Sequence, residues 1–252
     1  HMAEDLLALY SFTGGVAKYV QLLVDAGATT KSAMLDYIIH SDSIFLGEGK
    51  AILIEEFGKD YGVYFSILSA IARGKTSRSE IENVVGREIG GYLTKLEIEY
   101  EVIAKKQPLF EKSSNKNVLY TIEDNFFTFW FRFIYKYSYM LEIENYESVR
   151  AIINRDYETF SGLMLERYFR RVLIESRAFT RIGGWWDRKG ENEIDIVAEN
   201  ELTGEATFFE VKRKADNIDM DVLERKAAAF LRATGELKGY RISYKGLSMD
   251  DM

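Results

Sequence analysis

No cysteine occurs among the 252 residues of the chain. Disulfide bonds and thiolate metal sites are therefore excluded, and a cysteine-free chain is typical of the cytoplasm. The chain also lacks an apolar run of about 18 residues, the length that a membrane-spanning helix requires. Its densest apolar stretch, residues 126–140, is interrupted by Arg132 and Lys136. We therefore expect a cytoplasmic protein with neither a signal peptide nor a membrane partner.

Basic residues are fewer than acidic ones. The chain has 33 lysines and arginines and 40 aspartates and glutamates, which gives a formal net charge of −7. The molecule as a whole is therefore not a basic nucleic-acid-binding protein, although a local basic patch is compatible with this sum. Hydrophobic residues make up 47% of the chain and aromatic residues 14%, enough for packed cores rather than disorder. The length suits two or three small domains or one large domain.

The spacing of apolar residues divides the chain into three segments. Residues 1–54 space them three and four apart, which predicts helices in a segment too short to bury its own core. We expect this segment to pack on another part of the protein. Residues 55–124 predict three helices followed by two strands, the order of a winged-helix domain. Residues 125–252 predict helices around three strands and a last strand, so we expect a mixed α+β, multidomain protein.

The second segment carries the residues that a winged helix usually turns towards DNA. Its third helix is expected over residues 87–98, and a basic, polar loop joins its two strands. The positive side chains there are Arg87, Lys95, Lys105, Lys106, Lys112 and Lys116. Interleaved glutamates dilute this positive charge, and winged helices also serve as protein-contact domains. Contact with DNA and contact with another protein are both consistent with this segment.

One glycine-containing stretch, Gly74-Lys75-Thr76, ends like a phosphate-binding loop. The full pattern needs a glycine where Ser69 stands, and a strand where a helix is expected. We therefore expect a helix end followed by a turn, and no nucleotide cofactor.

Charged residues stand inside two apolar runs of the third segment. The runs cover residues 191–199 and 206–214. Both have the composition of strands, whose side chains alternate between two faces. This alternation puts Asp195 and Val197 on one face of the first strand and Ile194 on the other. It also places Glu210 and Lys212 on a common face of the second strand.

A symmetric hairpin explains why these charges would meet. A turn centred on residues 202–203 sets Asp195 opposite Glu210, with Cβ atoms about 5 Å apart. Two carboxylates at this spacing repel each other unless positive charge intervenes. We expect Lys212 and a divalent cation to supply that charge.

Carboxylates on rigid strands are hard oxygen ligands that suit Mg²⁺ or Mn²⁺. Such a cation polarises a phosphoryl oxygen and activates water, while a nearby lysine steers the water or stabilises charge on the phosphate. A third carboxylate is expected from the helix at residues 157–176, where Glu166 has largely apolar neighbours. The predicted catalytic residues are Glu166, Asp195, Glu210 and Lys212, and the predicted metal ligands are their three carboxylates.

Each of these residues also has a structural explanation, because a strand Glu and Lys can form an exposed ion pair of little energetic value. Lys226, on the helix predicted over residues 221–235, either contacts phosphate at the site or is a solvated lysine. Trp185 and Trp186 could stack on bases, but packing of at least one against the sheet is the stronger expectation. A local positive patch around the site would consist of Arg170, Arg171, Arg181, Arg188, Lys189, Arg213 and Lys214.

The helix Glu, the strand Asp and the Glu-x-Lys of the next strand together resemble the PD-(D/E)xK nuclease superfamily. The matching residues are Glu166, Asp195 and the triplet Glu210-Val211-Lys212, within residues 157–245. The resemblance implies a restriction-endonuclease-like α/β domain that uses Mg²⁺ or Mn²⁺. It also implies cleavage of nucleic acid, with double-stranded DNA as the expected partner.

A wider resemblance covers nearly the whole chain. The stretch TGGVAKYV is similar to the helical lid of archaeal-type AAA+-related ATPases, with Ala17 where those proteins usually have proline. Residues 124–133 resemble the aromatic marker that opens their C-terminal domain of unknown function. The resemblance implies a lid remnant at 1–54, a winged helix at 55–124 and a nuclease-like domain at 125–252. It also implies an ATPase module, absent from this sequence, as a partner, so the chain itself is not expected to hydrolyse ATP.

Three functions are consistent with these features. The first is a metal-dependent nuclease domain coupled to a winged helix. The second is a non-catalytic regulatory module of the ATPase, in which the nuclease-like fold only binds DNA or a partner protein and Lys212 is dispensable. The third is a DNA-binding regulator that works through the winged helix, with duplex binding that depends on Lys95, Lys105 and Lys106. Whether the chain is an enzyme stays open, with the nuclease favoured, and each function is compatible with an oligomer.

Overall fold

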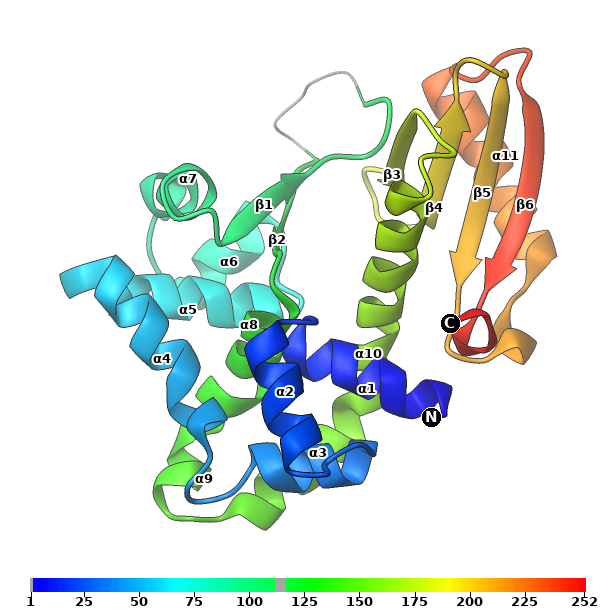
Figure 1. Cartoon of the computed structure of the whole chain (residues 1–252). Coiled ribbons are helices and arrows are strands. Elements are labelled where there is room, and N and C mark those ends of the chain that lie inside the picture. The colour runs from blue at the N-terminus through cyan, green and yellow to red at the C-terminus, as the bar shows by residue number, and fades with distance from the viewer. Residues whose placement is uncertain (1, 112–116) are drawn as a thin grey trace. The chain divides into compact units, whose positions relative to one another are not determined.

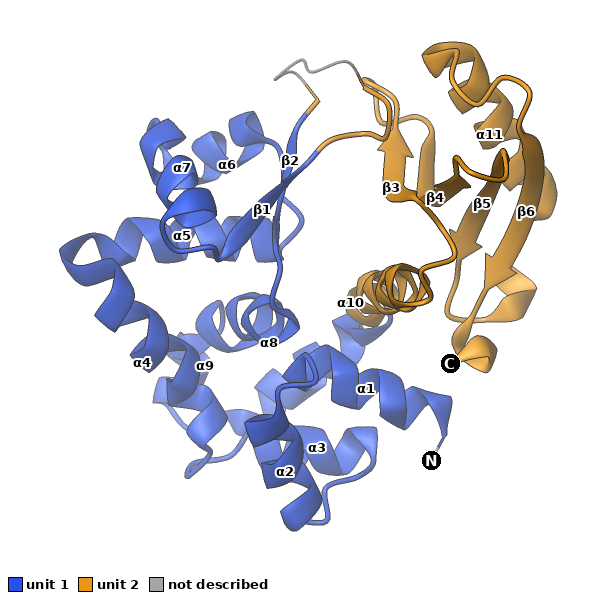
Figure 2. Cartoon of the chain, turned by 45° about the horizontal axis from the view of Figure 1, so that its top comes forward, with its two compact units in different colours: residues 1–106, 118–158 blue, residues 107–117, 159–252 orange. Residues whose placement is uncertain are grey.

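A computed structural model describes residues 2–111 and 117–252 of the chain. Helices and two small sheets make up a mixed α+β protein, which confirms the predicted class (Figure 1). No helix in these two ranges is both long and apolar enough to cross a bilayer. Two compact units are formed, unit 1 by residues 1–106 and 118–158, and unit 2 by residues 107–117 and 159–252 (Figure 2). The division into segments 1–54, 55–124 and 125–252 stays a prediction.

Unit 1 begins with four helices. They are α1 (Ala3–Thr13), α2 (Ala17–Asp25), α3 (Lys31–Ile38) and α4 (Ile44–Phe57). Helix α1 ends at Gly14, whose φ of 64° is a left-handed conformation that glycine adopts without strain. Phe12 of α1 is fully buried, and its ring lies 4.8 Å from that of Phe129. The first helices therefore share a core with the aromatic segment, as expected for a segment without its own core.

Three helices and a β-hairpin follow, in the predicted order. They are α5 (Tyr61–Ala72), after the short 3-10 turn η1 (Gly58–Asp60), then α6 (Arg78–Val85), α7 (Gly90–Ile98), β1 (Ile103–Lys106) and β2 (Leu119–Ile122). Ser77 caps α6 in a reciprocal capping box with Glu80, as the Ser-x-x-Glu spacing predicts. The strands are antiparallel, with Ile103 opposite Ile122. This order is that of a winged helix, and the assignment itself stays a prediction.

The aromatic stretch that begins the third segment, where we expected one helix over residues 126–141, is divided into three short elements. It consists of α8 (Asn125–Phe129), a π-helical turn η2 (Trp130–Tyr135) and α9 (Ser138–Glu142). A π-turn adds a residue to the turn and shifts the side chains around the axis. Here it accompanies the burial of two consecutive rings, Trp130 and Phe131. A side chain on Gly49 of α4 would collide with the Trp130 ring, so this close approach requires glycine.

Unit 2 is built on a four-stranded sheet. Its elements are residues 159–175 of α10 (Tyr146–Glu175), β3 (Arg181–Trp186), β4 (Glu193–Asn200), β5 (Glu205–Val211), η3 (Ala215–Asn217), α11 (Met220–Thr234), β6 (Arg241–Leu247) and η4 (Met249–Asp251). The strand order is β3-β4-β5-β6, in which only β5 and β6 are parallel (Figure 1). Helix α11 connects these two strands and packs on the sheet through Leu223, Ala227 and Phe230.

The β4–β5 hairpin has the predicted register, since Ile196 pairs with Phe209 and Asn200 with Glu205. The predicted alternation along β4 is wrong, however, because Ile194 and Val197 both pack in the cluster against α11. The pairing of β3 with β4 shifts between Gly183 and Trp185, where β4 contains one extra residue. Such a bulge reverses the alternation locally, and a simple period of two cannot anticipate it.

Candidate active site

Strands β4 and β5 bring the two predicted carboxylates together. Their register sets Asp195 across from Glu210, as the neighbouring pair Ile196 and Phe209 requires. Both side chains are mostly removed from water, with 11% of Asp195 and 6% of Glu210 exposed. Oδ2 of Asp195 accepts a hydrogen bond of 2.7 Å from the backbone N–H of Val211. This bond ties the carboxylate to β5 and fixes its direction.

Lys212 lies between the two carboxylates. Its Nζ is 2.7 Å from Oε1 of Glu210 and 3.9 Å from Oδ2 of Asp195. Burial lowers the pKa of Lys212, but the hydrogen bond to Glu210 and the charge of Asp195 outweigh burial, so the pKa is raised. The lysine is therefore charged and partly neutralises the pair.

Lys226 of α11 reaches the same site. Its Nζ lies 3.4 Å from Oε2 of Glu210, and only 23% of its side chain is exposed. Lys226 therefore lies beside Glu210 and is not a fully solvated lysine, and its contact with phosphate stays a prediction. Each oxygen of Glu210 thus faces a different lysine.

Glu166 adds a third carboxyl group from α10. Burial, followed by the negative charges of Asp195 and Glu193, raises the pKa of Glu166 to about 8, against the opposing effect of Arg170 and Lys212. Burial also raises the pKa of Asp195, although the hydrogen bond from Val211 opposes this effect. Raised carboxyl pKa values mean that the site favours the uptake of a proton or another cation.

Arg170 has a role that the sequence did not reveal. Its Nη2 donates a hydrogen bond of 3.0 Å to the backbone carbonyl of Asp195. A Cβ atom on Gly184 would lie 3.2 Å from the same Nη2, so glycine leaves room for the guanidinium. The consecutive glycines in β3 were the available signal for a close approach of this kind.

The carboxylates suit Mg²⁺ or Mn²⁺ in kind, because both ions prefer oxygen ligands. The ligand set predicted for them was Asp195, Glu210 and Glu166. Within the described ranges, no three or more His, Asp or Glu side chains are gathered closely enough to hold a metal ion. Lys212 and Lys226 instead supply the positive charge at Glu210. The donor chemistry therefore fits a divalent cation, which would have to replace an ammonium group as the counter-charge of Glu210.

The residues predicted for nucleic-acid contact in unit 1 lie near acidic or aromatic groups. Lys105 lies 3.4 Å from Glu97, and Lys106 lies 3.8 Å from Glu123. The Arg87 guanidinium lies 5.4 Å from the centre of the Tyr92 ring. Lys95 lines a surface hollow with Asp60, Glu88 and Tyr92, among others. Lys112 and Lys116 lie outside the described residues, and DNA contact by unit 1 stays a prediction.

Several arginines of the predicted positive patch in unit 2 are committed to protein groups. Arg171 pairs with Glu175, Arg181 with Glu199, and Arg213 donates to the Ser161 hydroxyl. Arg170 binds the Asp195 carbonyl, as described above. The positive charge close to the carboxylates therefore comes mainly from Lys212, Lys226 and Arg170.

Two comparisons find similar proteins, and neither match has an assigned function. Residues 130–228 match DUF234, a family described as archaeal and bacterial proteins of unknown function. An uncharacterized protein of Methanocaldococcus jannaschii is 34% identical over 235 residues, which cover 87% of this chain and 50% of that protein. The chain thus spans about half the length of this curated relative. No solved structure matches the chain. The predicted domain of unknown function is confirmed, and these matches carry no evidence on ATPase or nuclease function.

Proposed function

We propose that unit 2 is a metal-dependent phosphodiesterase domain that cleaves nucleic acid. The supporting observation is the placement of Asp195, Glu210 and Lys212 on neighbouring strands, with Glu166 and Lys226 contributed by the two helices. The order helix, three strands, helix and strand agrees with the restriction-endonuclease-like fold that the sequence motifs imply. Unit 1 would contribute a winged helix that positions the nucleic acid.

The residues of the site have complementary chemical roles in this proposal. Asp195 and Glu210 would hold Mg²⁺ or Mn²⁺, and Glu166 would have to come closer to join them as the third ligand. When bound, such a cation polarises a phosphoryl oxygen and lowers the pKa of water. Lys212 would place its ammonium group against the phosphate and stabilise the charge that develops there. Lys226, once released from Glu210, would contact a neighbouring phosphate oxygen.

A cleavage assay with a matched pair of lysine variants tests this proposal. Supercoiled DNA, linear duplex, single-stranded DNA and RNA would be incubated with the protein in Mg²⁺ and in Mn²⁺. Lys212→Ala should reduce the rate by about 10²–10³, the usual effect of removing a group that stabilises transition-state charge. Lys238→Ala removes an exposed lysine that belongs neither to the site nor to the predicted positive patch and should leave the rate unchanged. Cleavage that survives Lys212→Ala would refute the catalytic assignment.

A second candidate function is a non-catalytic nucleic-acid- or protein-binding module. It is favoured by one observation, that Lys212 and Lys226 both lie within ion-pair distance of Glu210. This function predicts binding of duplex DNA without divalent cations and no cleavage of any substrate. Binding measured in EDTA, together with the cleavage assay, separates the two functions.

We also propose that an AAA+-related ATPase module is a partner of this chain. The support is the sequence resemblance at residues 13–20 and 124–133. Co-purification of the chain with a separately expressed ATPase module would test it, and failure to associate would remove this partner.

A further inference from the structure

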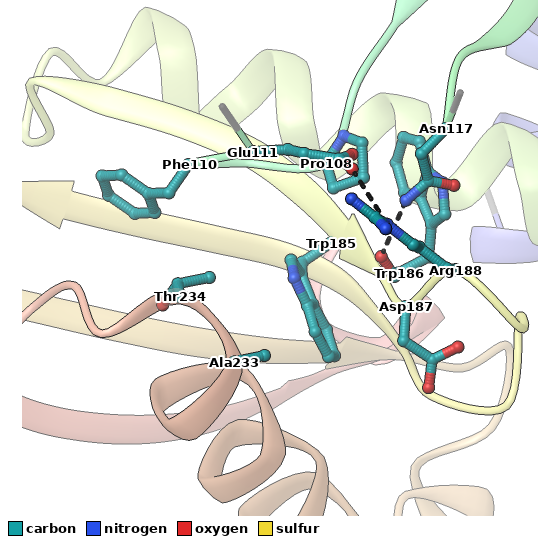
Figure 3. Close-up of a pocket in the computed structure, with 10 residues that line it drawn as sticks. All are labelled: Pro108, Phe110, Glu111, Asn117, Trp185, Trp186, Asp187, Arg188, Ala233 and Thr234. Atoms are coloured by element: carbon teal, nitrogen blue, oxygen red, sulfur yellow. Dashed lines mark hydrogen bonds and ion pairs between the residues drawn. The ribbon is translucent and has the colours of Figure 1, made fainter. Parts of the chain in front are cut away.

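A hollow in unit 2 lies apart from the residues of the carboxylate site. It has a volume of about 450 Å³ and lies between β3 and the C-terminal end of α11 (Figure 3). Pro108, Phe110, Trp185 and Ala233 give it an apolar and largely aromatic wall, and Arg188 lies at its polar side. Pockets of this size and composition are typical of small-molecule sites, in which a few polar groups fix orientation.

Trp185 supplies a polar group without a partner. The residue is only 5% exposed, and one side of its ring packs edge-on against Phe230 at 5.5 Å. Its indole N–H finds no hydrogen-bond acceptor among the residues that the structure describes, whereas the neighbouring Trp186 donates to Asn117 at 3.0 Å. Figure 3 shows the Trp185 ring at the hollow. This N–H is not among the buried side-chain atoms without a hydrogen-bond partner, so it is open to solvent at the hollow, where an acceptor of a ligand can replace water.

The aromatic wall is held in place by the protein itself. The backbone N–H of Leu109 donates to the Gly184 carbonyl at 2.9 Å, which ties the segment before Phe110 to β3. A Cβ atom on Gly183 would lie 2.9 Å from the end of the Leu109 side chain, so glycine leaves room for Leu109 in its present position. The Phe110 ring lies 6.0 Å from Phe230 and 4.8 Å from the Arg181 guanidinium. The hollow is therefore formed before any ligand enters.

Arg188 offers positive charge at the same hollow. Its side chain is 75% exposed, and its guanidinium lies 3.9 Å from the Glu111 carboxylate, at the limit of an ion pair. The Asp187 carboxylate instead accepts hydrogen bonds from backbone N–H groups of Lys189, Glu191 and Asn192 and is committed to the turn. The guanidinium can therefore reach an anionic group of a ligand.

We propose that this hollow binds one unpaired nucleotide of a nucleic-acid strand. The base would contact Trp185 and Phe110 and accept the Trp185 hydrogen bond, and its phosphate would meet Arg188. Aromatic contacts of this kind hold bases of any sequence. The assignment to a strand rests on the proposed nuclease function, because Trp185 pairs with Ile194, the residue before Asp195. A base that enters such a pocket must leave its duplex, so the substrate class would be single strands or frayed ends.

Binding without cleavage tests the inference. Fluorescence anisotropy of a dye-labelled single strand would be measured in EDTA and compared with the same strand in a duplex and with a free nucleoside monophosphate as competitor. We expect the single strand to bind at least about 10-fold more tightly than the duplex. Trp185→Phe keeps a ring but removes the N–H, and Arg188→Gln removes an exposed charge. Each should weaken binding about 5–10-fold, the usual size for the loss of one hydrogen bond or one charge contact.

The control is Arg177→Gln, which removes the same charge from an exposed residue that does not line the hollow. Equal affinity for single strand and duplex would overturn the inference, as would unchanged binding by Arg188→Gln, a surface change that leaves the fold intact. A free nucleotide that binds as tightly as the strand would overturn the assignment to a strand. Single-strand binding without any cleavage would refute the nuclease and leave this binding site standing, whereas cleavage without strand preference would refute this inference alone.

Discussion

Lysine and glutamate meet in both units, in different surroundings. In unit 1, Lys105 is 42% exposed and faces Glu97, which is 26% exposed. In unit 2, Lys212 and Lys226 face Glu210, which is only 6% exposed. Exposed ion pairs contribute little, whereas a buried carboxylate depends on its partners because water cannot replace them. The same residue types therefore form a dispensable surface pair in one unit and a strongly coupled charge cluster in the other.

Removing the carboxylate of Glu210, which Lys212 and Lys226 share, should have the largest effect on stability. Glu210→Ala leaves two ammonium groups without their partner and should lower the free energy of unfolding by about 3 kcal/mol. The matched change in unit 1, Glu97→Ala, should cost less than about 1 kcal/mol. Urea denaturation of both variants measures the difference. Equal losses would show that burial does not distinguish the two clusters.

Titration of Glu166 should have the next largest effect, on the pH dependence of stability. The pKa of this buried carboxyl rises from its ordinary 4.5 to about 8. The folded protein therefore keeps a proton that the unfolded chain loses, and stability falls as the pH rises from about 4.5 to 8. Glu166→Gln cannot titrate, so its stability relative to wild type should increase over this range by up to about 1.4 kcal/mol for each pH unit. Thermal unfolding from pH 5 to 9 measures this, and parallel curves for the two proteins would contradict it.

Removal of the competing ammonium group should have a smaller effect. Lys226→Met keeps the length of the side chain but removes the charge beside Glu210, so Mn²⁺ binding should strengthen about fivefold. Lys238→Met, which changes an exposed loop lysine, is the matched control. Calorimetric titration with Mn²⁺ compares them. Identical affinities of both variants would show that Lys226 does not compete with the cation.

The smallest effect is expected on the affinity of unit 1 for duplex DNA. Because Lys105 already has Glu97 as a partner, Lys105→Ala should change duplex affinity by less than about twofold at physiological salt. Glu97→Ala should increase the affinity, since it releases the lysine. Anisotropy with labelled duplex tests both variants. A large loss in Lys105→Ala would restore this lysine as a main DNA contact.

The features that could be predicted correctly from the sequence are those that depend on a local pattern of residues. The meeting of Asp195 and Glu210 required only the period of a strand and the symmetry of the turn at residues 202–203. The position of Ile194 was missed because a bulge between β3 and β4 breaks that period. The π-turn at Trp130 accompanies close packing against Gly49, a residue 81 positions earlier, which helical spacing does not encode.

The remainder of the site depends on how helices approach the sheet. Helical spacing places Lys226 on α11, but only the packing of α11 on β5 decides that it reaches Glu210. The same holds for Arg170, whose bond to the Asp195 carbonyl needs the space left by Gly184. Such contacts join residues that no local pattern relates.

The most direct measurement of the central claim is Mn²⁺ binding to the wild-type protein and to Asp195→Asn, a change that keeps the shape of the side chain. Electron paramagnetic resonance of free Mn²⁺ counts bound ions without any substrate. The carboxylate cluster of unit 2 predicts saturable binding by the wild type that is lost, or weakened by at least about tenfold, in Asp195→Asn. No binding by the wild type, or equal binding by both proteins, would contradict a metal-dependent site at Asp195 and Glu210.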